Sequence, residues 1–234
     1  MIDTSFDVRS DTPLGKDPDW YSATLRRYHQ ILWGRPLPSG APFELSDGRP
    51  LGYLLHRSDL GEFWLGSDAV IPSFFHKADK VVAQLLPGEL EEFNTLGYTI
   101  GGMMLFPANR VDGKMTINGA RGFHPRIADR FDLTVECIRR HYRGDDSPLA
   151  VVLQRYADFF RLFGDFAGYV EHFLLQDLVT DDGAGVEFAL PFDDFTGSPV
   201  PKDLDTYREY RDRSVTFINA RNGRIAALAT QNDW

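Results

Sequence analysis

The sequence predicts an α+β protein, with a small mixed or antiparallel sheet in the N-terminal half packed on a mainly helical C-terminal half. Short apolar runs separated by Gly, Pro and Asp-Gly turns fill residues 43–118, whereas apolar residues at three- and four-residue spacing dominate after residue 125. We find no internal repeat and no low-complexity linker. We therefore expect one globular domain over residues 1–234, with a sheet-bearing half (1–118) and a mainly helical half (119–234).

The first elements carry clear local signals. A helix is expected over residues 17–34, where Asp17 can cap the first turn, Pro18 suits that turn and Gly34 ends the helix. Residues 43–66 are expected to form strands, with a hairpin turn at Asp47-Gly48 and a second turn near Gly61.

The middle of the chain alternates between the two kinds of element. Ser67-Asp68 is expected to cap a helix over residues 69–86, which Pro72 should break or kink. We expect a short helix over 89–97, a buried strand over 98–106 and a further strand over 114–118.

The second half is expected to be helical. The expected helices cover 125–144, 147–164, 165–179 and 203–225, and one strand is expected in 185–195.

Composition excludes several classes. No apolar run approaches the ~18 residues that span a bilayer, and the start, MIDTSFDVRSD, lacks the features of a secretory signal. The single cysteine, Cys137, cannot form an internal disulfide and belongs to no CxxC zinc motif. These features favour a cytoplasmic protein without a membrane partner. The net charge of −9 argues against general nucleic-acid binding.

The charge is unevenly distributed, and residues 110–143 form a basic island. They contain eight Arg or Lys and four Asp or Glu, a balance of +4 that leaves −13 for the other residues. In the stretch FPANRVDGKMTINGARGFHPRIADRF (106–131), these cations lie among Asn, Gly and Pro. Such a basic island on an acidic protein can concentrate anions at one place.

We expect an anion site in this stretch, at the N-terminus of a helix that begins near Pro125. Unpaired N–H groups there attract negative charge, and Gly119 and Gly122 would let a ligand approach the backbone. The expected catalytic residues are His124 as proton carrier, with Arg121 and Lys114 stabilising negative charge. The expected ligand-binding residues are Asn109, Arg110, Asn118, Arg126 and Arg130.

This set of residues suits a phosphorylated ligand. It could cleave RNA without a metal, or hold a nucleotide such as NAD by its diphosphate. The partner is accordingly expected to be a nucleotide or a short RNA, and no bound cofactor is implied. The alternatives remain open: Arg121 could be structural, His124 could cap a helix, and Lys114 could simply face water.

Familiar catalytic motifs are absent from the sequence. DGKMT is not a phosphate-binding loop, because Ala108 and Met115 replace the required Gly and Ser or Thr. There is no GxGxxG, GxSxG, HExxH or EF-hand pattern, and no histidine pair at i, i+4. A metal-dependent hydrolase remains an alternative, with Asp165, Glu187 and the doublet Asp193-Asp194 as carboxylate ligands of Mg²⁺.

A non-enzymatic interaction protein is a second alternative. The stretch FFRLFGDFAGYVEHFLLQDLV, residues 159–179, has apolar residues on more faces than one surface helix needs. Part of it could form the interface of a homodimer. The competing interpretation is that these helices are central to the core.

Several segments together resemble an uncharacterised family of bacterial proteins. They include DPDWYSATLRRYHQILWGRPLPSG, GEFWLGSDAVI, NRVDGKMTINGARGFHPRIADRFDLTVECIRRHY and YADFFRLFGDFAGYVEHFLLQDLV, and PFDDF follows them. The resemblance covers nearly the whole chain. It implies a complete, single-domain cytoplasmic protein and supplies no catalytic residues.

Overall fold

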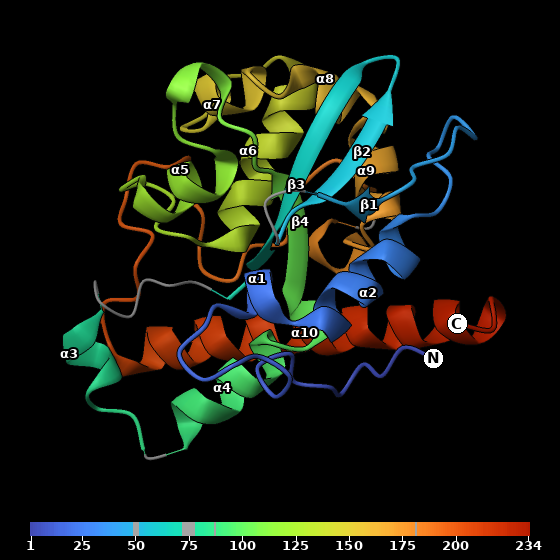
Figure 1. Ribbon diagram of the computed structural model, residues 1–234. Helices are drawn as coiled ribbons and strands as arrows, with labels where there is room; N and C mark the ends of the chain where they lie inside the picture. Colours follow the sequence, from blue (N-terminus) through green and yellow to red (C-terminus); the bar gives the residue numbers. More distant parts are fainter. Residues whose placement is uncertain (49–51, 72–77, 87, 181) are drawn as a thin grey trace.

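The protein is built on one antiparallel sheet. The computed structural model describes residues 1–48, 52–71, 78–86, 88–180 and 182–234. Four strands lie in the order β1-β2-β3-β4 (Figure 1). Their bounds are β1 Ser46–Asp47, β2 Leu54–Ser58, β3 Gly61–Ala69 and β4 Met103–Pro107. The predicted α+β class, with its sheet in the N-terminal half, is confirmed.

Strand β3 organises the sheet and carries part of the site. It forms a hairpin with β2, in which Ser58 pairs with Gly61, and it pairs with β4 from Leu65 to Ala69. Pairing with β4 keeps Ser67 and Asp68 in the strand, so the predicted helix cap at these residues is wrong. The predicted helix over 69–86 falls partly on residues 72–77, outside the described part, and includes α3 (Asp79–Val82).

The predicted helix over residues 17–34 is confirmed, but it is divided in two. The first helix is α1 (Pro18–Tyr21) and the second is α2 (Ala23–Trp33). Ser22 separates them because its backbone is extended and its hydroxyl accepts the N–H of Leu25 at 3.0 Å. This side-chain acceptor starts a new helix.

The region around residues 106–131, where the anion site is expected, differs most from the predictions. Helix α4 (Glu89–Gly97) is confirmed. The strand expected over 98–106 begins only at Met103, after a 3₁₀ turn. No strand forms at 114–118, because the hydroxyl of Thr116 accepts the N–H of Gly119 at 3.4 Å and starts helix α5 (Ile117–Phe123).

The helix expected to begin near Pro125 begins later. Helix α6 runs from Phe131 to Arg143 and ends at Gly144 in the left-handed region. Between α5 and α6 the chain turns sharply, with φ of 45° at Ala128 and 68° at Asp129. The predicted helix N-terminus at Pro125, on which the anion site depended, is therefore wrong.

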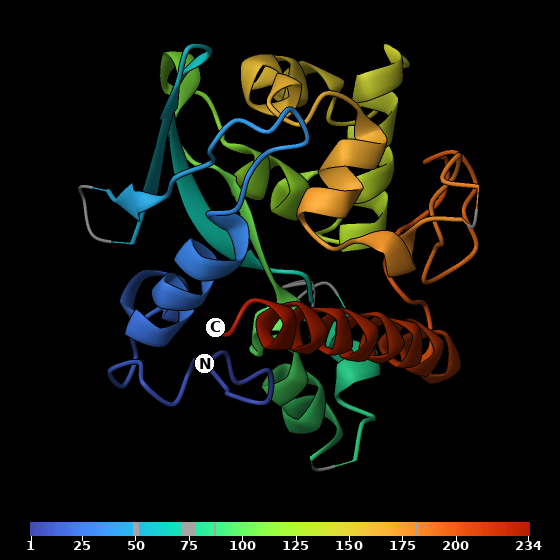
Figure 2. The ribbon, with the colours of Figure 1, turned by 90° about the vertical axis from the view of Figure 1, so that its right-hand side faces the viewer.

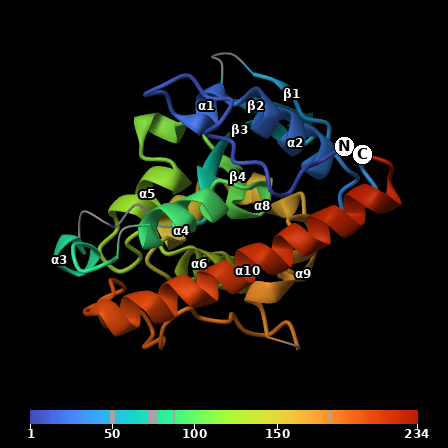
Figure 3. The same cartoon turned by 90° about the horizontal axis from the view of Figure 1, so that it is seen from below.

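The remaining helices form the second half. They are α7 Ala150–Gln154, α8 Ala157–Arg161, α9 Phe166–His172 and α10 Leu204–Gln231, with a 3₁₀ turn at Gln176–Leu178. Residues 185–195 contribute to an isolated bridge, Val179 with Val186, but to no named strand in the described part of the chain. Helix α10 crosses the whole molecule and packs against α3 and α4 (Figure 3).

The Phe-rich stretch lies in the core. Helices α7 to α9 group above α10 in the view of Figure 2, and Phe173, just after α9, packs on Trp33 at the end of α2 with ring centres 5.5 Å apart. Phe159, Phe160, Phe163 and Phe173 are each at most 1% exposed. This burial confirms the interpretation that the stretch is central to the core, and it removes the reason to expect an interface there. None of the helices in the described part is long and apolar enough to cross a bilayer.

Candidate functional site

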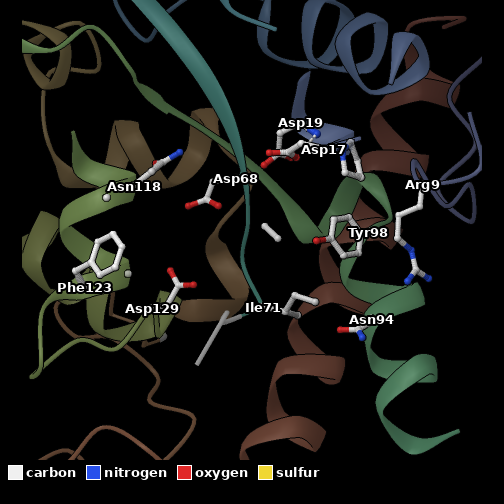
Figure 4. A pocket seen from close by; sticks show the side chains of 14 residues that line it. Arg9, Asp17, Asp19, Asp68, Ile71, Asn94, Tyr98, Asn118, Phe123 and Asp129 are labelled. Carbon is white, nitrogen blue, oxygen red and sulfur yellow. Dashed lines mark hydrogen bonds between the residues drawn. The ribbon is translucent and has the colours of Figure 1, made fainter. Parts of the chain in front are cut away.

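A hollow of about 920 Å³ opens between the end of β3, helix α1 and helix α5 (Figure 4). Four aspartates line it: Asp17, Asp19, Asp68 and Asp129. Arg9, Asn94, Tyr98, Asn118 and Phe123 also contribute to its walls. We call this hollow the acidic cleft. Residues 118–129, which belong to the basic island, thus contribute one wall of a cleft in which acidic side chains predominate.

Three distant segments deliver the carboxylates. Asp17 caps α1 by accepting the N–H of Asp19 at 3.0 Å, and Asp19 follows in the helix. Asp68 lies at the end of β3, where alternation along the strand places it on the face opposite Phe63. Asp129 belongs to the sharp turn between α5 and α6.

Arg121 joins two of these segments. It is fully buried, and its Nη1 lies 2.5 Å from Oδ2 of Asp68 and 3.0 Å from Oδ1 of Asp129. Its other donors reach the carbonyl of Asp129 at 2.8 Å and the hydroxyl of Thr134 at 3.3 Å. Burial alone would lower the pKa of Arg121, but Asp129 and Asp68 outweigh it and raise the pKa. The arginine therefore stays charged and holds β3 against the turn.

Asp68 has the electrostatics of a proton-transfer group. Burial raises its pKa to about 6, partly opposed by the charge of Arg121 and assisted by that of Asp129. Its side chain is still 26% exposed and points into the acidic cleft. A carboxyl group that titrates near neutral pH in an open hollow can both give and take a proton.

Asp19 is the second perturbed carboxyl group. Burial, followed by the charges of Asp68 and Asp17, raises its pKa well above the ordinary value, and a hydrogen bond with Ser67 acts in the opposite direction. Its Oδ1 is buried and has no hydrogen-bond partner in the described chain. The same holds for Oδ1 of Asn118, across the hollow. Each buried acceptor without a donor costs about 1–3 kcal/mol, a cost that a ligand's donor would remove.

A buried hydrogen-bond chain leads from the core to Asp19. The indole N–H of Trp33 donates to Nδ1 of His29 at 2.8 Å, and Nε2 of His29 lies 3.0 Å from the hydroxyl of Ser67. Because an indole can only donate, Nδ1 of His29 must accept, and its proton sits on Nε2 and points at Ser67. Burial, then the charge of Arg221, lowers the pKa of His29 to about 3. His29 thus cannot take a proton from Ser67, which excludes a Ser-His nucleophile here.

The far wall of the acidic cleft carries Tyr98 and Arg9. The guanidinium of Arg9 lies 5.2 Å from the centre of the Tyr98 ring and pairs with Asp7 at 2.7 Å and with Glu91 at 2.9 Å. Burial, then Asp19 and Asp17, raises the pKa of Tyr98. Arg9 is therefore already neutralised by two acids, and the cleft keeps its negative character.

The structure separates the residues predicted for the anion site. Asn118 lines the acidic cleft, and Arg110 lines a smaller neighbouring hollow. Lys114 and Arg126 are exposed. His124 ends α5 as its C-cap, its Nδ1 accepts the N–H of Arg126 at 3.2 Å, and burial together with Arg126 lowers its pKa.

Asn109 and two arginines of the predicted set serve the fold. The carbonyl of Asn109 accepts the hydroxyl of Tyr156 at 2.9 Å. Arg130 is 2% exposed and forms a two-bond pair with Asp132, at 3.1 and 2.5 Å. The burial of Arg130 and of Arg121 in carboxylate pairs argues against either one as a direct ligand of an anion.

The carboxylates proposed for a Mg²⁺ site do not converge. Asp165 caps α9 by accepting the N–H of Gly168 at 2.8 Å, and Asp194 pairs with Arg140. Within the residues that the structure describes, no group of three or more His, Cys, Asp or Glu could hold a metal ion. The metal-dependent alternative therefore lacks a site in the described chain. Cys137 is buried as expected, and burial raises its pKa to about 12.

The sequence did not single out Asp19, Asp68 or Tyr98 as site residues. The sequence pattern predicts a helix cap at Asp68, and Asp19 lies within a predicted helix, where nothing marks it as a site residue. A Ser-Asp pair that ends a strand, instead of starting a helix, would have been the signal for Asp68, but recognising it requires the pairing of β3 with β4.

Comparison with known proteins places the chain in a family. It belongs to a family of unknown function, DUF6994, whose model matches residues 2–225. This match confirms the resemblance to an uncharacterised family. Neither the curated proteins nor the solved structures contain a match to the chain.

Proposed function

We propose that this protein binds a small organic cation, an amine or a guanidine, in the acidic cleft. The observation that carries the proposal is the set of four aspartates around one hollow of about 920 Å³. Clefts lined by one sign of charge concentrate ligands of the opposite sign. The volume lies within the range of roughly 300–1,000 Å³ that is usual for small-molecule sites.

The raised pKa values of Asp19 and Asp68 support this proposal. A cation next to a carboxyl group favours its ionised form and lowers its pKa. Binding would then release protons from the cleft. Affinity for a permanent cation is accordingly expected to rise with pH, most steeply around the pKa of Asp68 near 6.

Asp68 is the residue that we propose for proton transfer if the bound cation reacts. Its pKa of about 6 lies close to a neutral working pH, which makes a carboxyl group an effective general acid or base. The ion pair with Arg121 fixes the position of one of its oxygens. The side chain of Asp68 is 26% exposed, so its carboxyl group can be reached from the cleft.

Thermal unfolding in the presence of single compounds tests the binding proposal. Acetamidine, agmatine and spermidine serve as cations, and phosphate and AMP as anions. A ligand at ~100 times its Kd stabilises a protein by ~2.7 kcal/mol, a rise in Tm of roughly 5–10 °C for a chain of this size. We expect at least one cation to produce this rise, and Asp19→Asn and Asp68→Asn to abolish it.

Asp158→Asn is the matched control, because Asp158 is also ion-paired but lies on α8, outside the cleft. It should keep the full response. A protein stabilised by the anions and by none of the cations would overturn the proposal.

A second candidate is the binding of a nucleotide, or the binding and cleavage of a short RNA, at the exposed cations of the basic island. The observation that favours it is that Arg110, Lys114 and Arg126 are exposed and form no ion pair with other described residues. His124 would carry the proton in RNA cleavage. Electrostatic binding to a single strand weakens as the salt concentration rises. When the logarithm of the binding constant is plotted against the logarithm of the salt concentration, each phosphate contacted makes the slope more negative by ~0.7.

A fluorescent RNA of ten nucleotides tests this candidate. Lys114→Ala and Arg126→Ala should each reduce the salt slope by roughly 0.7, whereas Arg161→Ala, whose cation lies on α8, should not. Equal slopes in all four proteins would remove the candidate. A homodimer and a cytoplasmic location also remain proposals, and sedimentation at several concentrations tests the former.

A further inference from the structure

A second, smaller hollow of about 170 Å³ adjoins the acidic cleft. Asp19 and Asn118 line both hollows, so the two share a boundary. The second hollow also includes Trp20, Tyr53 and Arg110 in its walls. Of the four aspartates of the acidic cleft, Asp19 is the one that also lines the second hollow, where it lies beside the Trp20 and Tyr53 rings and Arg110.

Two aromatic side chains form one wall. Trp20 directly follows Asp19 in α1, is 36% exposed, and packs edge-on against Tyr53 with ring centres 5.0 Å apart. The backbone of Gly52, at φ +100°, lies against the indole so closely that a Cβ there would come within 2.8 Å of it. The indole is thus held in place by backbone and by a second ring.

Small residues let the Tyr53 ring lie close to the sheet. A Cβ at Gly66 would lie 3.2 Å from Cβ of Ala108 and 3.5 Å from the ring of Tyr53, so this ring packs over Gly66 beside Ala108. The two small residues are neighbours on paired strands, since Gly66 pairs with Phe106 and the N–H of Ala108 bonds to the carbonyl of Trp64. The Trp20 and Tyr53 rings thus give the hollow an aromatic wall, against which a flat ligand group can pack.

The boundary between the hollows specifies what the flat group should carry. Oδ1 of Asp19 and Oδ1 of Asn118 are both buried acceptors without a donor in the described chain. A group that lies between them must present hydrogen-bond donors, and a positive charge would add attraction to the acidic side.

We propose that the two hollows form one site for an aromatic organic cation, whose charged N–H group lies at the boundary and whose ring enters the second hollow against Trp20. This inference rests on the proposed binding of cations in the acidic cleft. Stacking or edge-on contact with an aromatic wall adds to the burial of the ring's apolar area. Ligands with and without a ring should therefore differ in affinity.

The test is the ratio of affinities for benzamidine and acetamidine, measured by titration calorimetry on the full chain. The two compounds carry the same amidinium group and differ by the ring. We expect benzamidine to bind about tenfold more tightly to the wild type, which corresponds to ~1.4 kcal/mol. In Trp20→Leu the ratio should fall to about 2, with the affinity for acetamidine unchanged.

Two further variants keep the test decisive. Trp20→Phe retains a ring and should retain most of the ratio, which distinguishes loss of the wall from a folding defect. Tyr21→Leu removes an exposed aromatic side chain of the same helix that lines neither hollow, and it should leave the ratio unchanged.

The outcomes separate this inference from the proposed function. If acetamidine and benzamidine bind the wild type equally, or if Trp20→Leu keeps the full ratio, the ring does not enter the second hollow and the inference is overturned while cation binding stands. If neither amidine binds but agmatine or spermidine does, this inference is overturned while cation binding stands. If none of these cations binds, the proposed function fails and this inference fails with it.

Discussion

Two arginines are completely buried in the described part of the chain, and their surroundings differ. Arg121 is held by the carboxylates of Asp68 and Asp129, two residues that line the acidic cleft. Arg221, on α10, instead donates to the carbonyls of Phe173, Gly101 and Met103 at 2.8–3.1 Å. Arg121 is neutralised by two acids, one of them partly exposed, whereas the hydrogen bonds of Arg221 go to three carbonyls and to the sulfur of Met104.

The pKa of each arginine reflects this difference. Burial lowers the pKa of Arg221 to about 9, because no carboxylate opposes the cost of removing its charge from water. The pKa of Arg121 is raised despite equal burial. Arg221 therefore serves the packing of α10 against the sheet, while Arg121 serves a pair of acids that remain able to titrate. The comparison indicates which buried charge belongs to a site.

The largest expected effect is that of Arg121→Ala. Removing one partner of a buried ion pair typically costs 3–5 kcal/mol, because the remaining charge is left uncompensated. We expect a loss of about that size at pH 8 in urea unfolding. At pH 5 the loss should be smaller, since Asp68 can then hold a proton and needs no partner.

Arg161→Ala, which removes an exposed ion pair with Asp158, is the control and should change stability little at either pH. An Arg121→Ala loss that is the same at pH 5 and pH 8 would contradict the proposed coupling to Asp68.

Arg221→Met should destabilise the fold somewhat less, by about 3 kcal/mol. The methionine retains much of the apolar stem of the arginine, but three buried carbonyls lose their donor. Each unsatisfied carbonyl costs about 1–3 kcal/mol. Removal of the buried charge offsets part of this cost, because the charge no longer has to be taken out of water. Because no carboxylate depends on Arg221, the loss should be equal at pH 5 and pH 8. A loss of stability in Arg221→Met that varies between pH 5 and pH 8 as much as in Arg121→Ala would contradict the proposed difference between the two arginines.

The smallest expected effect concerns His29, a buried neighbour of Arg221, and the way in which the stability of the fold changes at acidic pH. The pKa of His29 is about 3 in the folded protein, against about 6.5 in an unfolded chain. Between these values the unfolded state binds a proton that the folded state does not, so stability rises with pH. The contribution is lost on acidification at up to ~1.4 kcal/mol per pH unit.

His29→Gln should reduce the slope of stability against pH by about this amount between pH 6 and pH 4. Ser67→Ala, which leaves His29 in place and removes its neighbour, should keep the slope. Asp68 acts in the opposite direction over part of this range, because its pKa is higher in the folded protein than in the unfolded chain, so the difference between variant and wild type is the quantity to compare. An unchanged slope in His29→Gln would show that His29 is not the group being protonated.

Local signals explain which elements could be predicted. The start of α1 and the start of α10 follow from side chains that bond to backbone within a few residues, as Asp17 does to Asp19 and Asp203 to Thr206. The helix at 17–34 also ends as predicted, since Gly34 is the C-cap of α2. These interactions are contained in a short window of sequence, so the prediction did not depend on the rest of the fold.

The site could not be predicted in the same way. The composition correctly drew attention to residues 106–131, and Asn118, Gly119 and Gly122 do line a hollow. The charge of that hollow was missed because Arg121 is neutralised by Asp68, which is 53 residues earlier in the chain and in another element. Counting charges along the sequence cannot reveal such a pair, which forms only when β3 meets the turn after α5.

Asp19 and Trp20 are neighbours in the short helix α1, and this limits how the site can vary among members of the family. One residue supplies a carboxylate to both hollows, and the next supplies an aromatic wall to the smaller one. A substitution at position 20 would alter the shape of the accepted ligand and leave its charge requirement intact. An insertion or deletion between Asp17 and Ser22 would displace both at once. Members of the family should therefore diversify by point substitution here and keep the length of this segment.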